Sequence, residues 1–249
     1  GSGGTTGDYN VALGAEAGKA LTSGGLNTLV GGKAGDALTT GGSNTAVGYR
    51  ALTTEDGHGL NTALGHEALA TLNAGADAYN TAVGYRAGTA MTSGTKNTLL
   101  GGLAGDSLTT GATNVAIGYD ALSTEDTGTA SVAIGAFALK LQNYNGNAYN
   151  VAIGHDAGKT ITTGDLNTLV GGEAGDSLTT GSRNVAVGTS ALATEDANGR
   201  NTAVGYAALN AQNAGADAYN AAVGYNAGLN VTTGIKNTIV GGQAGDALT

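Results

Sequence analysis

A pentapeptide of the type Asn-Thr-Ala-Val-Gly recurs fourteen times in this chain of 249 residues, and its spacing never drifts. Successive copies begin 17, 17, 17 and 19 residues apart, after which this cycle of 70 residues starts again. The fourteen copies begin at Asn10, Asn27, Asn44, Asn61, Asn80, Asn97, Asn114, Ser131, Asn150, Asn167, Asn184, Asn201, Asn220 and Asn237. A fixed period of this size is typical of solenoids, in which each unit buries its apolar side against its neighbours. We therefore predict an all-β protein, a parallel β-solenoid or β-roll of about fourteen coils, as one continuous array over residues 1–249.

The composition favours a folded chain that turns sharply and often. Glycine supplies 46 residues, while proline, cysteine and tryptophan are absent. Disordered chains lack apolar content, but 41% of these residues are hydrophobic and they recur in register. Without cysteine, the chain has neither disulfide bonds nor thiolate metal sites.

Charge and motif content exclude several classes of function. A formal net charge of −9 argues against nucleic acid as a partner, because phosphate binding needs clustered lysine and arginine. No apolar run reaches the ~18 residues that insertion into a membrane requires. The histidines His58, His66 and His155 show no metal-binding spacing, and no serine or glycine-rich loop matches a catalytic or phosphate-binding motif. We therefore expect no enzymatic activity and no organic cofactor.

The residues within the pentapeptide predict a short strand with two distinct faces. We number the first residue of each copy as position 1. Position 4 is always Val, Leu or Ile, and position 2 is Thr or Val in thirteen copies. Because side chains alternate along a strand, positions 2 and 4 share one face, which we assign to the interior of the coil. Position 3, which is Ala in ten copies and Leu or Ile in four, then points outward.

An outward face without polar side chains needs a cover, because a strand that is apolar on both faces is usually buried on both. A second copy of the chain is the simplest cover, and alanine is small enough to let backbones approach closely. We therefore predict a homo-oligomer. The alternative is a wider coil, in which position 3 contacts another segment of the same chain.

Further columns of identical residues define the corners of the coil. Position 5 is Gly in every copy, which indicates a corner that needs φ > 0 or has no room for Cβ. Segments such as Leu38–Gly41 predict a second short strand that ends in a turn. Asparagine at position 1 predicts a ladder of side-chain amides that hydrogen-bond from coil to coil, formed by residues such as Asn27, Asn44, Asn61, Asn80, Asn97 and Asn114.

Both ends of the sequence fall within a coil. Residues 1–9 match the end of a preceding repeat through Thr5 and Thr6, and the sequence stops at Thr249, thirteen residues into the last coil. We expect an array truncated in mid-coil at both ends, as in a segment of a longer fibre.

The segment Ser131-Val132-Ala133-Ile134-Gly135, followed by Ala138, resembles the head repeat of trimeric autotransporter adhesins. Segments 114–118 and 150–154 are near matches, and the longer segment 44–52 is similar to repeats of bacteriophage tail fibres. The resemblance extends over essentially the whole chain. It implies a left-handed parallel β-roll, a homo-trimer wound into one rod, and a role in attachment at a cell surface. The longer turns and the 70-residue cycle of this chain depart from the adhesin pattern.

Acidic residues recur with the same 70-residue cycle and offer candidates for a calcium site. One coil position holds Asp36, Asp106, Asp176 and Asp246, and another pair of positions holds Glu55-Asp56, Glu125-Asp126 and Glu195-Asp196. Equivalent carboxylates would lie four coils apart, roughly 19 Å, which is too far to share one ion. A Ca²⁺ ion would need one carboxylate together with carbonyl groups of neighbouring coils. The alternative is that all of these are solvated carboxylates in turns.

Tyrosines form another column, in which Tyr79, Tyr149 and Tyr219 precede the pentapeptide that follows each 19-residue interval. Their amphipathic rings are candidates for contact with a glycan or a cell-surface receptor, and packing over a corner glycine is the alternative. Threonine at position 2 in eight copies raises ice binding as a minor alternative, which the interior assignment of position 2 disfavours.

These patterns and the resemblance lead us to expect a structural rod segment of a fibre that supports attachment to surfaces. The expected location is extracellular, on a cell surface or on a virion. A glycan-binding or surface-binding adhesive shaft and a self-assembling secreted filament are the alternatives.

Overall fold

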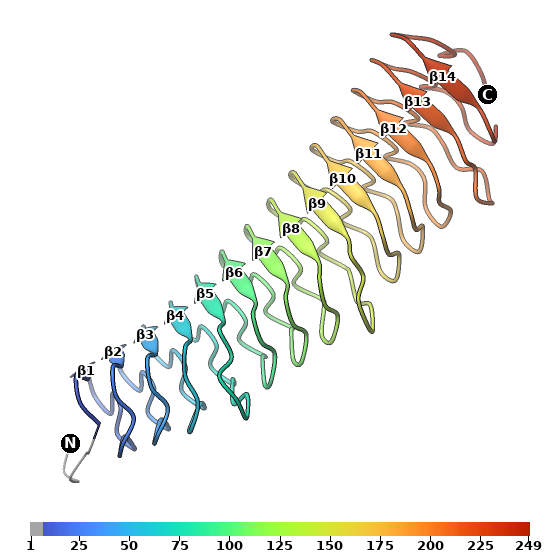
Figure 1. Cartoon of the computed structure of the whole chain (residues 1–249). Coiled ribbons are helices and arrows are strands. Elements are labelled where there is room, and N and C mark those ends of the chain that lie inside the picture. Colours follow the sequence, from blue (N-terminus) through green and yellow to red (C-terminus); the bar gives the residue numbers. More distant parts are fainter. Residues whose placement is uncertain (1–6) are drawn as a thin grey trace. The chain divides into compact units, whose positions relative to one another are not determined.

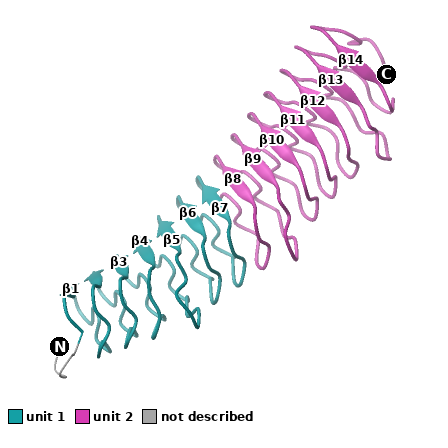
Figure 2. Cartoon of the chain, viewed as in Figure 1, with its two compact units in different colours: residues 1–120 teal, residues 121–249 magenta. Residues whose placement is uncertain are grey.

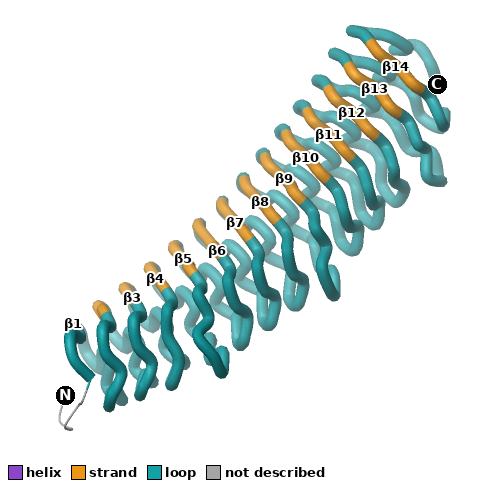
Figure 3. Tube along the Cα trace, in the orientation of Figure 1, coloured by secondary structure: helices purple, strands orange, loops and turns teal. Residues whose placement is uncertain are grey.

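The computed structural model describes residues 7–249, so Thr5 and Thr6, which align the first residues with the repeat, lie outside the described residues. The chain divides into two compact units, Gly1–Asp120 and Ala121–Thr249 (Figure 2). Residues 7–249 contain fourteen strands of three residues each and no helix, and loops and turns connect the strands (Figure 3).

Each unit carries seven strands, one from each pentapeptide (Figure 1). The strands of the first unit are β1 (Val11–Leu13), β2 (Thr28–Val30), β3 (Thr45–Val47), β4 (Thr62–Leu64), β5 (Thr81–Val83), β6 (Thr98–Leu100) and β7 (Val115–Ile117). The strands of the second unit are β8 (Val132–Ile134), β9 (Val151–Ile153), β10 (Thr168–Val170), β11 (Val185–Val187), β12 (Thr202–Val204), β13 (Ala221–Val223) and β14 (Thr238–Val240).

Within each unit, every strand pairs in parallel with the next strand of the sequence. The register joins equal positions of successive copies, so that Thr45 lies opposite Thr62 and Val47 opposite Leu64. The two additional residues of a 19-residue repeat do not disturb this register, since Thr62 in turn lies opposite Thr81. The predicted parallel β-solenoid, with one coil per pentapeptide, is confirmed in each unit.

The two faces of each strand are the reverse of the sequence-based prediction. Position 3 points into the coil, and its side chain is 0–6% exposed in every strand from β2 to β14. Positions 2 and 4 point outward, and none of their residues is buried in any coil. The assignment of positions 2 and 4 to the interior was therefore wrong, and so was the outward assignment of position 3.

The asparagine at position 1 explains why the strand takes this orientation. Asn27 is buried, and its Nδ2 donates a hydrogen bond of 2.9 Å to the carbonyl of Gly41, fourteen residues further along. Because side chains alternate, an inward asparagine at position 1 directs position 3 inward as well. Valine and threonine at positions 2 and 4 still suit the strand, since β-branched residues fit a pleated surface that is only half buried.

The 70-residue cycle is a cycle of filling the core. In the first two coils of each cycle position 9 is Gly, and one large residue at position 3 of the second coil occupies the space beside both glycines. A Cβ on Gly88 would lie 2.7 Å from Leu99 Cδ1, and a Cβ on Gly105 would lie 2.9 Å from Leu99 Cδ2. In the last two coils position 3 is Ala and position 9 is a buried Leu, as for Ala63 and Leu69. The large side chain that fills the interior therefore comes from position 3 in the first half of the cycle and from position 9 in the second half.

Glycine at position 5 is needed on both of the grounds that the sequence suggested. All fourteen of these glycines have φ between 125° and 145°, a region that residues with a side chain rarely adopt. A Cβ on Gly48 would also lie only 2.3 Å from the carbonyl oxygen of Gly65 in the next coil. Each coil thus turns its corner with the backbones of neighbouring coils in direct contact.

The predicted second strand of each coil does not form in the described residues. Segments such as Leu38–Gly41 adopt bends and irregular backbone, although Thr39 N–H still donates to the carbonyl of Asp56 in the next coil at 2.6 Å. This side of the coil therefore stacks through single hydrogen bonds rather than through a regular ladder.

Candidate functional site

Positions 2 and 4 form an outward sheet face. It is bordered by position 6 and by the residue that directly precedes the pentapeptide, which we number position 0. We call these four positions the outward face. No charged residue occurs at position 2 or 4 in any coil. Leu64 and Leu100 at position 4 are 44% and 45% exposed. The large exposed apolar residues of the outward face between β2 and β7 are Leu26, Tyr49, Leu60, Leu64, Tyr79, Tyr85, Leu100 and Tyr119. Position 4 is apolar in every coil, and an apolar row that continues from coil to coil is typical of a surface that binds a partner.

Aromatic rings stack along the edge formed by position 6. The ring centroid of His66 lies 5.4 Å from that of Tyr49 and 5.5 Å from that of Tyr85. Tyr49 also packs over the preceding coil, because a Cβ on Gly32 would lie 3.3 Å from its Cδ2. These rings therefore cover neighbouring backbone while about half of each tyrosine stays exposed, at 49% for Tyr49 and 55% for Tyr85.

The candidate contact residues Tyr79, Tyr149 and Tyr219 lie at position 0, on the opposite edge of the outward face, and are exposed. All three have left-handed backbone, with φ of 54°, 50° and 53°. Two of them have polar neighbours. The Tyr149 hydroxyl accepts a hydrogen bond of 2.9 Å from Asn147 Nδ2, and the Arg200 guanidinium lies 5.4 Å from the centre of the Tyr219 ring.

The asparagine column is buried and its amides are used in hydrogen bonds to the backbone. Asn27, Asn44, Asn61, Asn80, Asn97 and Asn114 are each at most 1% exposed. The Oδ1 atom accepts from the backbone N–H of the asparagine in the next coil, for example at 2.9 Å between Asn80 and Asn97. The Nδ2 atom donates to a carbonyl across the coil, for example from Asn80 to Gly94 at 2.8 Å. The column thus supplies polar partners for the interior of the coil.

The calcium candidates Asp36, Asp106, Asp176 and Asp246 are partly buried at position 10, and no cluster of ligands surrounds them in residues 7–249. Thr53 Oγ1 donates a short hydrogen bond to Asp36 Oδ1. Burial raises the pKa of Asp106, and the nearby Asp120 carboxylate raises it further against the opposing effect of Arg86. Burial likewise raises the pKa of Asp176, although the ammonium group of Lys159 lowers it.

The sequence left open that the Glu-Asp pairs are solvated carboxylates in turns. The glutamates are not solvated but lie inside the coil. Glu55, Glu125 and Glu195 are 0% exposed, while Asp56 and Asp196 beside them are exposed. The glutamates occupy position 12, where nine of the fourteen coils have Leu, Met, Ile or Val. Aligning this column across the coils would have revealed carboxylates in an otherwise apolar position.

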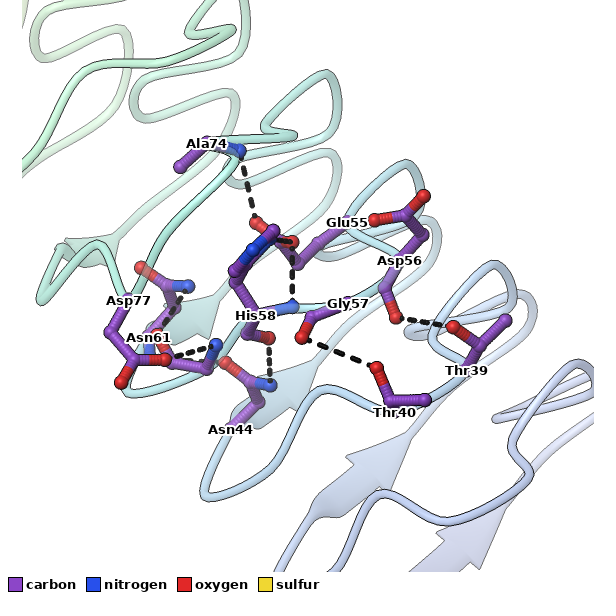
Figure 4. A network of polar contacts seen from close by, with 11 residues as sticks. Thr39, Thr40, Asn44, Glu55, Asp56, Gly57, His58, Asn61, Ala74 and Asp77 are labelled. Atoms are coloured by element: carbon purple, nitrogen blue, oxygen red, sulfur yellow. Dashed lines mark hydrogen bonds and ion pairs between the residues drawn. The ribbon is translucent and has the colours of Figure 1, made fainter.

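Glu55, Asp56 and His58 are the one group of three metal-ligating side chains that lie together in the described part of the chain, with ligand atoms within 4.8 Å of one another. Glu55 Oε1 accepts from His58 N–H at 3.2 Å and lies 3.4 Å from His58 Nδ1, and Glu55 Oε2 accepts from Ala74 N–H at 3.4 Å (Figure 4). The carboxylate thus has protein partners inside the coil. Gly128 and Asn198 replace His58 in the two equivalent turns, so the group of three is local to one coil.

Among residues 7–249 no helix has the length and apolar character needed to cross a membrane. Comparisons of the chain with protein-family models, with curated proteins and with solved structures find no significant match.

Proposed function

We propose that this chain is a structural rod segment of an extracellular or virion fibre, and that copies of the chain pack together through the outward face. Its regular stacking supports the proposal, because a solenoid in which each coil contacts only its neighbours makes an extended element. The observation that carries the proposal is position 4, which is aliphatic in all fourteen coils and buried in none.

Covering the outward face would release free energy at every coil. Full burial of a Val or Leu side chain contributes roughly 1.5–3 kcal/mol, so covering the exposed half of a residue such as Leu64 contributes about 1 kcal/mol. The contribution repeats with each coil, so even a short array gains several kcal/mol on association. Three copies around one axis would bury this face on every chain. We therefore propose a homo-trimer of left-handed coils, in line with the resemblance to adhesin head repeats, for attachment to a cell surface or other target.

The mass of the protein in solution tests this proposal. A single chain has a mass of 23.9 kDa, and we expect sedimentation to give a multiple of that value. The double variant Leu64→Asp, Leu100→Asp should sediment as a single chain and keep its fold, because both side chains point outward. The control Asn73→Asp, Ala76→Asp adds the same charge at exposed loop positions and should leave the mass unchanged. A wild-type protein that stays at the mass of one chain at every concentration would refute packing through this face.

Two other functions would use the same face. Exposed Tyr79 and Tyr85 favour a glycan-binding shaft, for which binding to a glycan array should be lost in the variant Tyr79→Ala, Tyr85→Ala. Threonines at position 2 point outward in five consecutive strands, β2 to β6. This orientation favours ice binding, which the interior assignment of position 2 had disfavoured. Thermal hysteresis by a single-chain protein would select ice binding over the fibre.

A further inference from the structure

Unit 2 contains the same buried polar arrangement twice, 70 residues apart, and the two copies differ in how well they are satisfied. Glu125 and Glu195 occupy position 12 of their coils, and Gln142 and Gln212 occupy position 12 of the coils that follow. All four side chains are 0% exposed. A carboxylate that is ionised in such an interior is costly unless hydrogen bonds replace its water.

Glu125 has close donors on both oxygens. Its Oε1 accepts from Gly128 N–H at 2.8 Å, and its Oε2 accepts from Gln142 Nε2 at 2.9 Å and from Tyr144 N–H at 3.2 Å. Charge-assisted hydrogen bonds of this length stabilise an ionised carboxylate strongly. Gln142 Nε2 donates at the same time to Ser131 Oγ at 2.8 Å, so this amide group is fully used.

Glu195 has longer contacts with its side-chain donors, and its partner glutamine is not engaged. Asn198 Nδ2 donates at 3.2 Å and Asn201 Nδ2 lies 3.5 Å from Glu195 Oε2, while the backbone N–H groups of Asp196 and Asn198 also favour the ionised form. Gln212 Nε2 is buried and has no hydrogen-bond partner in the described residues, although Gln212 Oε1 accepts from Asn220.

The first residue of the following coil explains the difference. Ser131 is small and its hydroxyl accepts from Gln142, so the glutamine amide lies between Ser131 and Glu125. Asn201 takes the place of the serine in the other copy, and its own amide points at Glu195. Asn201 therefore occupies the place that a serine would leave open, and Gln212 does not hydrogen-bond to Glu195.

We propose that Glu195 makes its coil a proton-sensitive weak point of unit 2, which opens locally while the carboxyl is ionised and closes when it is protonated. The burial of this side chain raises its pKa above the ordinary glutamate value, which the hydrogen bonds from Asn198 only partly offset. A group whose pKa is raised on folding binds a proton more tightly in the closed state. The contribution of Glu195 to stability is therefore largest at low pH, where the carboxyl is protonated, and it is lost as the pH rises through the folded-state pKa.

Few charged groups act on this carboxyl. Asp196 in the same turn is the acidic neighbour, and its charge raises the pKa of Glu195 further. Leu178 and Gln212, which occupy position 12 in the coils on either side, carry no charge. Since no cation pairs with Glu195 in the described residues, protonation is the direct way to remove the buried charge.

Hydrogen exchange of matched backbone amides in the wild-type chain tests the proposal. Leu192 N–H donates to the carbonyl of Ala208 at 3.0 Å and Thr194 N–H to that of Asn210 at 3.1 Å, beside Glu195. Leu122 N–H to Ala138 at 3.0 Å and Thr124 N–H to Lys140 at 3.1 Å are the equivalent bonds beside Glu125. We expect protection of Leu192 and Thr194 to be about tenfold lower than that of their equivalents near neutral pH. The gap should narrow as the pH falls through the folded-state pKa of Glu195, which lies above the ordinary glutamate value.

Two variants separate the charge from other differences between the coils. Glu195→Gln, an uncharged mimic of the protonated acid, should raise the protection of Thr194 about tenfold near neutral pH and make it independent of pH. Glu125→Gln should lower the protection of Thr124, because it sets an amide against donors that now face a carboxylate. Equal protection of the two wild-type sites at all pH values, or lower protection of Thr194 in Glu195→Gln, would overturn the proposal. If a variant does not fold, the wild-type comparison at two pH values still decides.

Discussion

Moving the large core side chain from position 3 to position 9 within one coil tests the packing cycle directly. Leu99 is fully buried beside Gly88 and Gly105. Leu99→Ala should cost about 2–5 kcal/mol, because it removes the apolar contacts and leaves a cavity. Gly105→Leu alone should also be costly, since a Cβ there already lies 2.9 Å from Leu99 Cδ2. Overpacking adds about 1–3 kcal/mol, and the φ of 55° adds about 1–2 kcal/mol for a residue with a side chain.

The double variant Leu99→Ala, Gly105→Leu reproduces the Ala and Leu pairing of Ala63 and Leu69. We expect it to lose less stability than the sum of the single variants, by at least about 2 kcal/mol. Some loss should remain, because Gly88 also loses its contact with Leu99 and a Cβ on Gly105 still lies 2.8 Å from Leu108 Cδ1. Urea unfolding followed by circular dichroism gives the three values for a double-mutant cycle.

A matched control pairs Leu99→Ala with Gly35→Leu, whose glycine contacts Leu29 instead. Since these two sites lie four coils apart, roughly 19 Å, their effects should simply add. Additive effects in both pairs would refute the view that Leu99 and position 9 share one space.

Two further predictions concern the backbone and the asparagine column. Gly48→Ala should cost at least about 3 kcal/mol, because its φ is 136° and its Cβ would meet the Gly65 carbonyl. Gly75→Ala should cost only about 1 kcal/mol, since φ is 70° and no atom lies within 4 Å; similar urea midpoints for the two would contradict the corner model. Asn80→Ala should cost about 2–4 kcal/mol, because it leaves Asn97 N–H and the Gly94 carbonyl without their partners. The exposed Asn73→Ala serves as its control, and an equal midpoint would show that the column does not stabilise the coils.

The number of coils, the parallel register and the corner glycines could be predicted because the repeat period constrains all fourteen copies at once. Which strand face is inside could not be read from alternation, since alternation states only that positions 2 and 4 share a face. Position 1 held the missing signal. An asparagine in thirteen copies is better explained by buried amide bonds than by solvent, and it places position 3 inside.

The same reasoning explains what was missed at the candidate sites. Glu55, Glu125 and Glu195 were considered only as calcium ligands or as solvated carboxylates in turns, although their column at position 12 is otherwise mostly aliphatic. The predicted second strand does not form, and segments such as Leu38–Gly41 stack on the next coil through single hydrogen bonds such as that of Thr39 N–H. The column of Tyr79, Tyr149 and Tyr219 was identified from its period, while the stacking of Tyr49, His66 and Tyr85 depends on ring orientation that a sequence does not contain.

The shared leucine also limits how the gene can change in length. Deleting one coil, such as residues 27–43, would remove Leu29, which packs beside Gly18, and would place Ala46 at position 3 of the next coil instead. Deleting or duplicating a whole 70-residue cycle would preserve every such pairing. We therefore expect the array to tolerate gain or loss in steps of four coils, so that the 70-residue cycle, and not the single pentapeptide, is its packing unit.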